Sequence, residues 1–302
     1  MRCLIAPALA LVLGIGHAVA ADPAPKTFDP KDPISAVMTP VTLLRSNDFK
    51  GFYELMPAED KAKAETEWKA SQAKAAAGGD MGDQGQMAEF NAFLAKCLAP
   101  NAVETLYAEA EPQLADINPQ EISQQLQMFS GMVPMMAMQQ GGQQDPQKQQ
   151  FVTALGGMML GASQWILTAG LDDKAKLRQA ITHLVAGAKG LGVKEVKELQ
   201  ALPLDQFLGR LGPVVKEMKA AAAIYDIQAD PFLDSVKATA QGDGNERTLA
   251  VAFTAFGKPY TLPVKVELKD GHWVVSQKNA KAMSMGPMGG MGNDPAMPLD
   301  PK

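Results

Sequence analysis

The fold depends on the stretch Phe151-Val-Thr-Ala-Leu-Gly-Gly-Met-Met-Leu-Gly-Ala-Ser-Gln-Trp-Ile-Leu-Thr-Ala-Gly-Leu171, which carries no charged side chain. It belongs to one of the two longest uncharged runs after the N-terminus and lies between Lys148 and Asp172. A run this apolar must be shielded from water, either by the rest of the protein or by lipid. Asp145-Pro146 precedes it and combines a capping carboxylate with a proline suited to the first helical position. We therefore expect a helix here.

Two environments would suit this helix. A membrane-spanning helix needs about 20 mostly apolar residues, and Gly157-Met-Met-Leu-Gly161 has the small-xxx-small spacing of packed membrane helices. Against a span, Ser163 and Gln164 interrupt the run, and no cluster of Lys or Arg flanks it. We expect the buried central helix of a soluble bundle, in which the glycines allow close helix packing. Membrane association through residues 151–171 is the alternative.

The N-terminus has the pattern of a secretory signal. Arg2 supplies a positive start, residues 4–16 are apolar, and Ala18-Val19-Ala20 is a small-x-small cleavage motif. Residues 1–20 are therefore predicted to be a signal peptide cleaved near Ala20, which indicates a periplasmic or secreted protein. Cys3 precedes the apolar stretch, so it does not fit a lipid-accepting cysteine.

Charge and cysteine content narrow the class of partner. Loss of Arg2 with the signal leaves 27 basic against 33 acidic residues, a net charge of about −6. Such a balance argues against nucleic acid or anionic lipid as the main partner. Cys97 is the cysteine that remains, so we expect no internal disulfide and stability from packing. It is expected to be a small buried hydrophobe, with an intermolecular disulfide as the alternative.

Helical patterns dominate residues 33–234. The segments expected to be helical are 33–44, 49–56, 57–77, 86–98, 101–111, 118–136, 146–171, 177–188 and 207–225. Residues 21–32 are rich in Pro and Asp and are predicted to be disordered. Residues 78–85 are rich in glycine and predict a flexible break.

From residue 235 to 277 the apolar period changes to two, which indicates β-strands. Asp270-Gly271 is a strong hairpin signal, and Gly257-Lys258-Pro259 is a second turn. Pro263 cannot donate to a ladder, so its strand is expected to be an edge there or to carry a bulge. The predicted fold class is α+β: a mainly α-helical bundle with a C-terminal three- or four-stranded antiparallel β-meander, whose apolar face lies on the helices.

Two segments resemble a known type of protein. Val264-Lys-Val-Glu-Leu-Lys-Asp-Gly-His-Trp-Val-Val275 resembles the closing hairpin of small exported proteins of the nuclear-transport-factor-two-like or cystatin-like type. Leu43-Leu-Arg-Ser-Asn-Asp-Phe-Lys-Gly-Phe-Tyr-Glu-Leu-Met56 is similar to their opening helix pair. The resemblance implies a curved sheet with a concave, ligand-binding face, and it implies no fixed set of catalytic residues.

Catalytic motifs are scarce. After signal removal only His183 and His272 remain, which disfavours an ordinary zinc site. Gly-x-Ser-x-Gly, the P-loop and the dinucleotide fingerprint do not occur in the sequence. Two carboxylate pairs fit a helix first turn and an exposed face: Asp172/Asp173 and Glu109/Glu111. We therefore expect a protein that is not an enzyme.

Methionine is the unusual feature, with 18 residues in the chain. The segment 278–302, predicted to be disordered, holds a candidate site for Cu(I) or Ag(I), soft ions that thioethers bind well: Met283, Met285, Met288 and Met291. A second cluster lies before the central helix: Met128, Met132, Met135, Met136 and Met138. The alternatives are a low-complexity linker and an adaptable core, or a flexible surface that holds unfolded or hydrophobic partners.

Together these features predict a non-catalytic binding or interaction module of the cell envelope. Its partner is expected to be another protein or a small apolar ligand, and not nucleic acid. A Cu(I)-binding role through the tail and membrane association are the alternatives.

Overall fold

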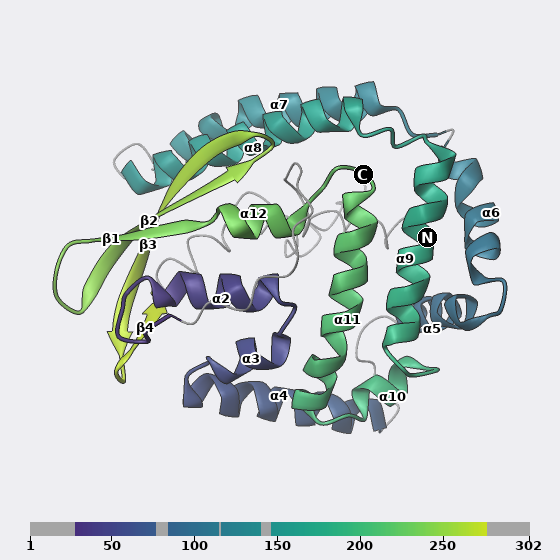
Figure 1. Ribbon diagram of the computed structural model, residues 1–302, viewed down its shortest axis with the longest axis horizontal. Helices are drawn as coiled ribbons and strands as arrows, with labels where there is room; N and C mark the ends of the chain where they lie inside the picture. The colour runs from purple at the N-terminus through teal and green to yellow at the C-terminus, as the bar shows by residue number, and fades with distance from the viewer. Residues whose placement is uncertain (1–27, 77–83, 115, 140–145, 277–302) are drawn as a thin grey trace, which may run out of the picture.

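The computed structural model describes residues 28–76, 84–114, 116–139 and 146–276 (Figure 1). Within these ranges eleven helices and a four-stranded antiparallel sheet build an α+β fold, as the sequence predicts. In Figure 1 the sheet lies at one end of the molecule, α9 and α11 run side by side towards the other, and α7 and α8 lie along the top. The predicted signal peptide and the methionine-rich tail fall outside the described residues.

The first five helices are α2 (Ser35–Arg45), α3 (Phe49–Glu54), α4 (Ala58–Ala76), α5 (Gln84–Leu98) and α6 (Ala102–Leu114). They correspond to the first five predicted segments. Pro112 was expected to end its helix, but α6 continues to Leu114. A proline in the last turn leaves the carbonyl four residues earlier without its donor, and this residue, Ala108, is exposed to water.

The later helices are α7 (Pro119–Gln139), α8 (Pro146–Thr168), α9 (Lys174–Gly190), α10 (Val196–Gln200), α11 (Leu204–Ala223) and α12 (Ala229–Ser235). Asp173 caps α9, because its carboxylate accepts from the backbone N–H of Ala175 at 2.7 Å and of Lys176 at 3.1 Å. The predicted role of this carboxylate at a helix start is confirmed. Past the end of α9, Gly192 takes the positive φ of 65° that glycine adopts without strain.

The sheet is a meander in the order β1 (Lys237–Gln241), β2 (Glu246–Ala255), β3 (Lys258–Lys269) and β4 (His272–Val275). Both predicted turns occur, and the one at Asp270-Gly271 joins β3 to β4 as expected. The turn between β2 and β3 is predicted at Gly257-Lys258-Pro259 but is formed by Phe256-Gly257, because Lys258 and Pro259 already pair with β2. Each turn places two successive residues at positive φ, Phe256 and Gly257 between β2 and β3 and Asp270 and Gly271 between β3 and β4. This is the requirement of the two-residue turns that match strand twist.

Pro263 marks an unpaired edge. Leu268 donates to Asn245 at 2.8 Å, on the β2 side of β3, whereas Ser276 donates to the carbonyl of Lys265 at 3.0 Å on the other side. Backbone groups alternate between the two sides of a strand, so the nitrogen of Pro263 faces away from β2. β4 pairs only with the last four residues of β3. The predicted edge position of Pro263 is therefore confirmed.

One core lies under the sheet. The inward side chains of the four strands pack on α2, α8 and α12 and include Leu249, Val251, Phe253, Val264, Val266 and Trp273. The indole of Trp273 donates to the carbonyl of Lys31 at 3.0 Å and so holds the segment before α2 on the sheet. The predicted apolar face of the sheet is confirmed.

A second core joins α5, α6, α9 and α10, with α11 packed against it. Its fully buried members include Leu94 and Cys97. Ion pairs complete the junction between the two cores. Arg45 at the end of α2 binds Asp230 at 3.0 Å and Asp234 at 3.1 Å in α12, and Lys219 of α11 binds Asp230 at 2.7 Å.

Candidate interaction surface

The glycines of α8 pack against the β2–β3 hairpin. A Cβ at Gly157 would lie 2.9 Å from the Tyr260 ring, and one at Gly161 would lie 2.7 Å from the Cβ of Phe256. Both separations are too short for a real Cβ, so only glycine allows this approach. The sequence predicts close packing at these positions correctly, but the neighbour is a β-hairpin and not another helix.

α8 is also less buried than a central helix. Its residues Gln149–Thr168 are long and apolar enough to cross a membrane by length and composition, and 28% of the most apolar stretch is buried. Trp165 is half-buried and donates to the carbonyl of Tyr225 at 2.6 Å, so protein shields this ring on one side. The expectation of a buried central helix is wrong, because α8 lies at the surface with one face against the sheet and α7.

α7 covers a second face of α8. Its start is capped by Asn118, whose side chain accepts from the N–H of Glu121 at 3.3 Å. Ser123 and Val133 are buried on the inner face of α7. Ser130 lies on the same face and donates to the carbonyl of Gly156 in α8 at 3.0 Å. The two helices therefore form a packed antiparallel pair.

The outer face of α7 is apolar and exposed. We call it the methionine surface, and its members are Ile122, Met128, Phe129, Met132 and Met135. Met128 and Met135 are each 64% exposed, and Phe129 is 54% exposed. Ile122 and Phe129 share the helical spacing of the buried Val133, yet both side chains are exposed. The reason is that α7 is apolar on more than one face, so its period alone does not choose the face that packs.

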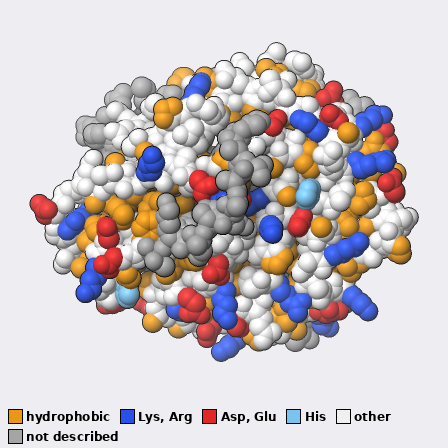
Figure 2. All heavy atoms as spheres, in the orientation of Figure 1, with side chains coloured by type: hydrophobic (Ala, Val, Ile, Leu, Met, Phe, Trp, Pro, Cys, Tyr) orange, Lys and Arg blue, Asp and Glu red, His pale blue; other side chains and the backbone are white. Residues whose placement is uncertain are grey.

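Charge is nearly absent from this part of the chain. Between Glu121 and Asp172 the sequence holds only Asp145 and Lys148 as charged residues. Figure 2 shows charged side chains over the right, lower and left parts of the molecule, while the upper band, over α7, is mostly white with some orange. Seven of the fourteen strongly exposed large apolar side chains among the described residues belong to α7 and α8. Apolar exposure is therefore concentrated on one helix pair, which is typical of an interaction site.

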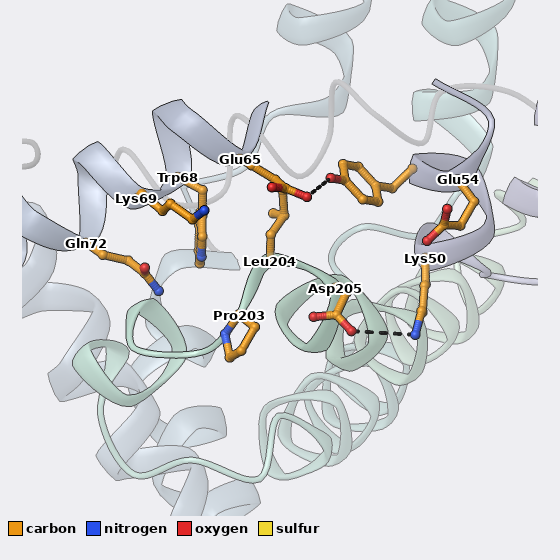
Figure 3. A pocket seen from close by; sticks show the side chains of 10 residues that line it. Lys50, Glu54, Glu65, Trp68, Lys69, Gln72, Pro203, Leu204 and Asp205 are labelled. Atoms are coloured by element: carbon orange, nitrogen blue, oxygen red, sulfur yellow. Dashed lines mark hydrogen bonds and ion pairs between the residues drawn. The ribbon is translucent and has the colours of Figure 1, made fainter. Parts of the chain in front are cut away.

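A groove of about 400 Å³ lies elsewhere, between α3, α4 and the start of α11 (Figure 3). Its lining includes Lys50, Tyr53, Glu65, Trp68, Gln72 and Asp205. The polar atoms are largely paired with one another. Tyr53 donates to Glu65 at 2.9 Å, and Lys50 lies 3.6 Å from Asp205.

Two more donors of the groove are bound to backbone. Trp68 donates to the carbonyl of Leu202 at 2.9 Å, and Gln72 donates to the same carbonyl at 2.8 Å. Trp68 also stacks on Phe207 with ring centroids 4.7 Å apart. These side chains attach α4 to α10 and α11, so the groove is explained by packing between helices.

The two histidines lie in different environments. His183 was expected to be a solvated residue; it is half-exposed, and its Nδ1 lies 2.7 Å from Glu217 across the α9–α11 contact. His272 is exposed at the start of β4, on the opposite sheet face from Trp273, as predicted. The two other carboxylates singled out in the sequence pair with lysines: Glu109 binds Lys96 at 2.7 Å, and Glu111 binds Lys174 at 2.6 Å.

Cys97 is fully buried, and burial raises the pKa of its thiol to about 11. The prediction of a small buried hydrophobe is confirmed. Within the described ranges, no cluster of three or more His, Cys, Asp or Glu side chains is arranged to hold a metal ion. The predicted Cu(I) ligands Met283, Met285, Met288 and Met291 lie outside the described residues.

Comparison with protein-family models, curated proteins and solved structures finds no match. The resemblance to the nuclear-transport-factor-two-like or cystatin-like type therefore stays a prediction.

Proposed function

We propose that this chain is an exported, non-catalytic interaction module that binds apolar segments of another protein on the methionine surface of α7. The observation that carries the proposal is the bare outer face of α7, where Met128, Phe129, Met132 and Met135 follow helical spacing and stay exposed. Export is supported by the signal pattern of residues 1–20, and the absence of a catalytic role by the missing motifs.

Methionine suits such a surface. Its side chain is unbranched and polarisable, so it adapts to partners of different shape and is frequent at promiscuous binding sites. The lack of nearby charge means that an apolar segment would dock without removing ionic groups from water, which is costly when they are left unpaired. The paired groove at Tyr53 and Trp68 offers no comparable set of free apolar side chains.

Fluorescence anisotropy with a reduced, alkylated and therefore unfolded reporter protein tests this proposal. The variant Met128→Gln/Met132→Gln/Met135→Gln keeps side-chain length but removes the apolar surface, and we expect its affinity to fall about tenfold or more, equivalent to about 1.4 kcal/mol. The matched control is Leu55→Gln/Leu184→Gln/Leu268→Gln, which changes three exposed apolar side chains on other elements. Equal binding by the parent and both variants would show that α7 is not the site.

A membrane surface is the competing partner, because α8 has the length and composition of a span and is only partly buried. Flotation with phosphatidylcholine vesicles separates the two. We expect the protein to stay at the bottom of the gradient. If the protein floats with the vesicles and the α7 substitutions abolish this flotation, the partner of the methionine surface is lipid and not protein.

The predicted copper site in the tail is tested separately. Cu(I) is titrated into the protein and into its Met283→Gln/Met285→Gln/Met288→Gln/Met291→Gln variant. Equal affinities would remove the tail as a metal site, since amides are poor ligands for this soft ion.

A further inference from the structure

We propose that residues 283–297 of this same chain occupy the methionine surface of α7 when no partner is bound. The inference rests on the proposed binding surface and assigns its resting occupant. Such an occupant would keep the five exposed apolar side chains of one helix away from water.

The size of the surface favours a tethered occupant. Five side chains that are about half exposed present on the order of a few hundred Å², the size of the largest patch on an ordinary monomer. A stable dimer buries roughly 800 Å² on each partner, so a second copy would be held only weakly by this face. A segment of the same chain is present at an effective concentration of about millimolar. Even a weak contact is then well populated.

The described chain ends in a suitable place. Ser276 is bound to Lys265 at the edge of β3, and β4 runs antiparallel to β3, towards Lys258. That end of β3 lies against α8, where Tyr260 touches Gly157. Six residues, 277–282, can span about 20 Å when extended, a large part of the length of β3 that β4 leaves unpaired. A chain of this length therefore allows the tail methionines to reach α8, one helix away from the methionine surface.

The free edge of β3 does not retain this segment as a strand. Pro259 and Pro263 both lie on the side that faces away from β2, and neither has an N–H to donate. Edge prolines are a known protection against added strands. A chain that leaves β4 would find one backbone donor, that of Thr261, along this edge.

The sequence of the segment complements α7. Residues 282–293 carry no charge and contain Met283, Met285, Met288 and Met291, and a fifth methionine follows at Met297. Docking residues 282–293 on Met128 and its neighbours brings no charged group out of water, because the next charged residue, Asp294, lies beyond Met291. An uncharged segment that docks on a face rich in Lys, Arg, Asp or Glu would remove charged groups from water. The uncharged part of the tail is therefore expected to bind the uncharged helix pair.

Paramagnetic relaxation in the protein with its tail intact tests the placement. A nitroxide is attached through Gly290→Cys in the chain that begins at Ala21, which lacks Cys3; Cys97 does not compete, because it is fully buried. The ε-methyl signals of Met128, Met132 and Met135 should broaden, while those of Met56, between α3 and α4, and Met87, in α5, should not, because these helices lie on the other side of the molecule from α7 in Figure 1. No selective broadening would overturn the proposal. So would broadening that appears between spin-labelled and separately isotope-enriched molecules, since this means a second copy.

The reporter assay gives a second readout. Replacing the four tail methionines by glutamine should raise the affinity for the unfolded reporter, about tenfold if the tail covers the surface nine-tenths of the time. Unchanged affinity would contradict the proposal. If broadening is seen but no variant binds the reporter, the tail contact stands and the proposed function fails. If binding needs α7 but the methyl signals stay sharp, the function stands and this inference fails.

Discussion

Two helix pairs of this molecule share one kind of contact but differ on their outer faces. In α7–α8, Gly156 lies at the contact, where a Cβ would be in van der Waals contact with the carbonyl oxygen of Ser130 at 3.6 Å. In α9–α11, Gly187 lies at the contact, where a Cβ would be 3.3 Å from the Cβ of Glu217 and 3.6 Å from the carbonyl oxygen of Val214. Outside the contact, α9 carries charged side chains that pair with α6, whereas the outer face of α7 is apolar.

The outer ion pairs of α9 show what a completed surface looks like. Lys174 binds Glu111, and Arg178 lies 3.3 Å from Glu104 while its guanidinium covers the Tyr107 ring at 4.4 Å. Such pairs add little stability at an exposed site, but they keep a helix face compatible with water. Among the described side chains of α7, Glu121 is the only charged one, so its outer face has no comparable set of ion pairs. The contrast teaches that the inner contact holds each pair together, while the outer face decides what else it binds.

The largest expected effect comes from filling the glycine contact of α8. In Gly161→Leu the new side chain meets the Cβ, Cγ and Cδ2 atoms of Phe256, which cannot move without shifting the hairpin. We expect a loss of about 3 kcal/mol in the free energy of unfolding, measured by urea denaturation. The matched control is Gly209→Leu on α11, where a Cβ meets nothing within 4 Å. A loss of similar size in both variants would mean that the contact between Gly161 and Phe256 is not the cause of the destabilisation.

The sequence predicts most elements of this fold because their signals are local. Asp270-Gly271 defines its hairpin through the positive φ that both positions require, and the spacing of Leu177 to Ala188 defines α9. The prediction for Pro263 succeeds because a missing N–H restricts where a strand can pair. None of these inferences needs knowledge of a distant residue.

What the sequence does not predict is which face meets which neighbour. Gly157 and Gly161 predict a close approach by another element. The local sequence does not predict that Tyr260 and Phe256, about a hundred positions later, are the residues that approach them. Likewise Glu217 is 34 residues from His183, and only the packing of α9 on α11 brings them together. For the same reason the sequence leaves the methionine cluster of α7 open between an adaptable core and a partner-binding surface: these residues suit both environments.

The pH dependence of stability tests whether water reaches the Cys97 thiol in the core beneath α9. Burial raises the pKa of the Cys97 thiol to about 11, above the value of about 8.5 for a free cysteine. A raised folded-state pKa means that the folded protein keeps its proton while the unfolded chain loses it, so stability falls as the pH rises from about 9 to about 11. The fall attributable to Cys97 is on the order of 2 to 3 kcal/mol.

Cys97→Ala supplies the control for this slope. Burial also raises the pKa of Tyr225 and Tyr260, so part of the alkaline loss remains in the variant. Urea denaturation at pH 8, 9, 10 and 11 should give a shallower decline in Cys97→Ala than in the parent. Parallel declines would show that water reaches the thiol.

On the outer face of α7 a small gain is expected. Gly131 is helical and exposed, and a Cβ there meets nothing within 4 Å. Gly131→Ala should therefore raise the free energy of unfolding by about 0.5 to 1 kcal/mol through helix propensity alone. Urea denaturation measures it. A loss of stability would mean that another segment already packs closely on this face. The outer face of α7 would then differ from that of α9 in what covers it, and not in being exposed.

The smallest effect is expected at the ion pair between α9 and α11. His183 and Glu217 are 2.7 Å apart but about one-third exposed, so water screens their attraction. Glu217→Gln keeps an acceptor oxygen within reach of the imidazole and removes only the charge. We expect the free energy of unfolding to change by less than about 1 kcal/mol, because the apolar contact of Ile181 and Val185 with the second core is untouched. A larger loss in urea denaturation at pH 6 would mean that charge, and not apolar packing, holds α9 on α11; the two helix pairs would then be built on different principles.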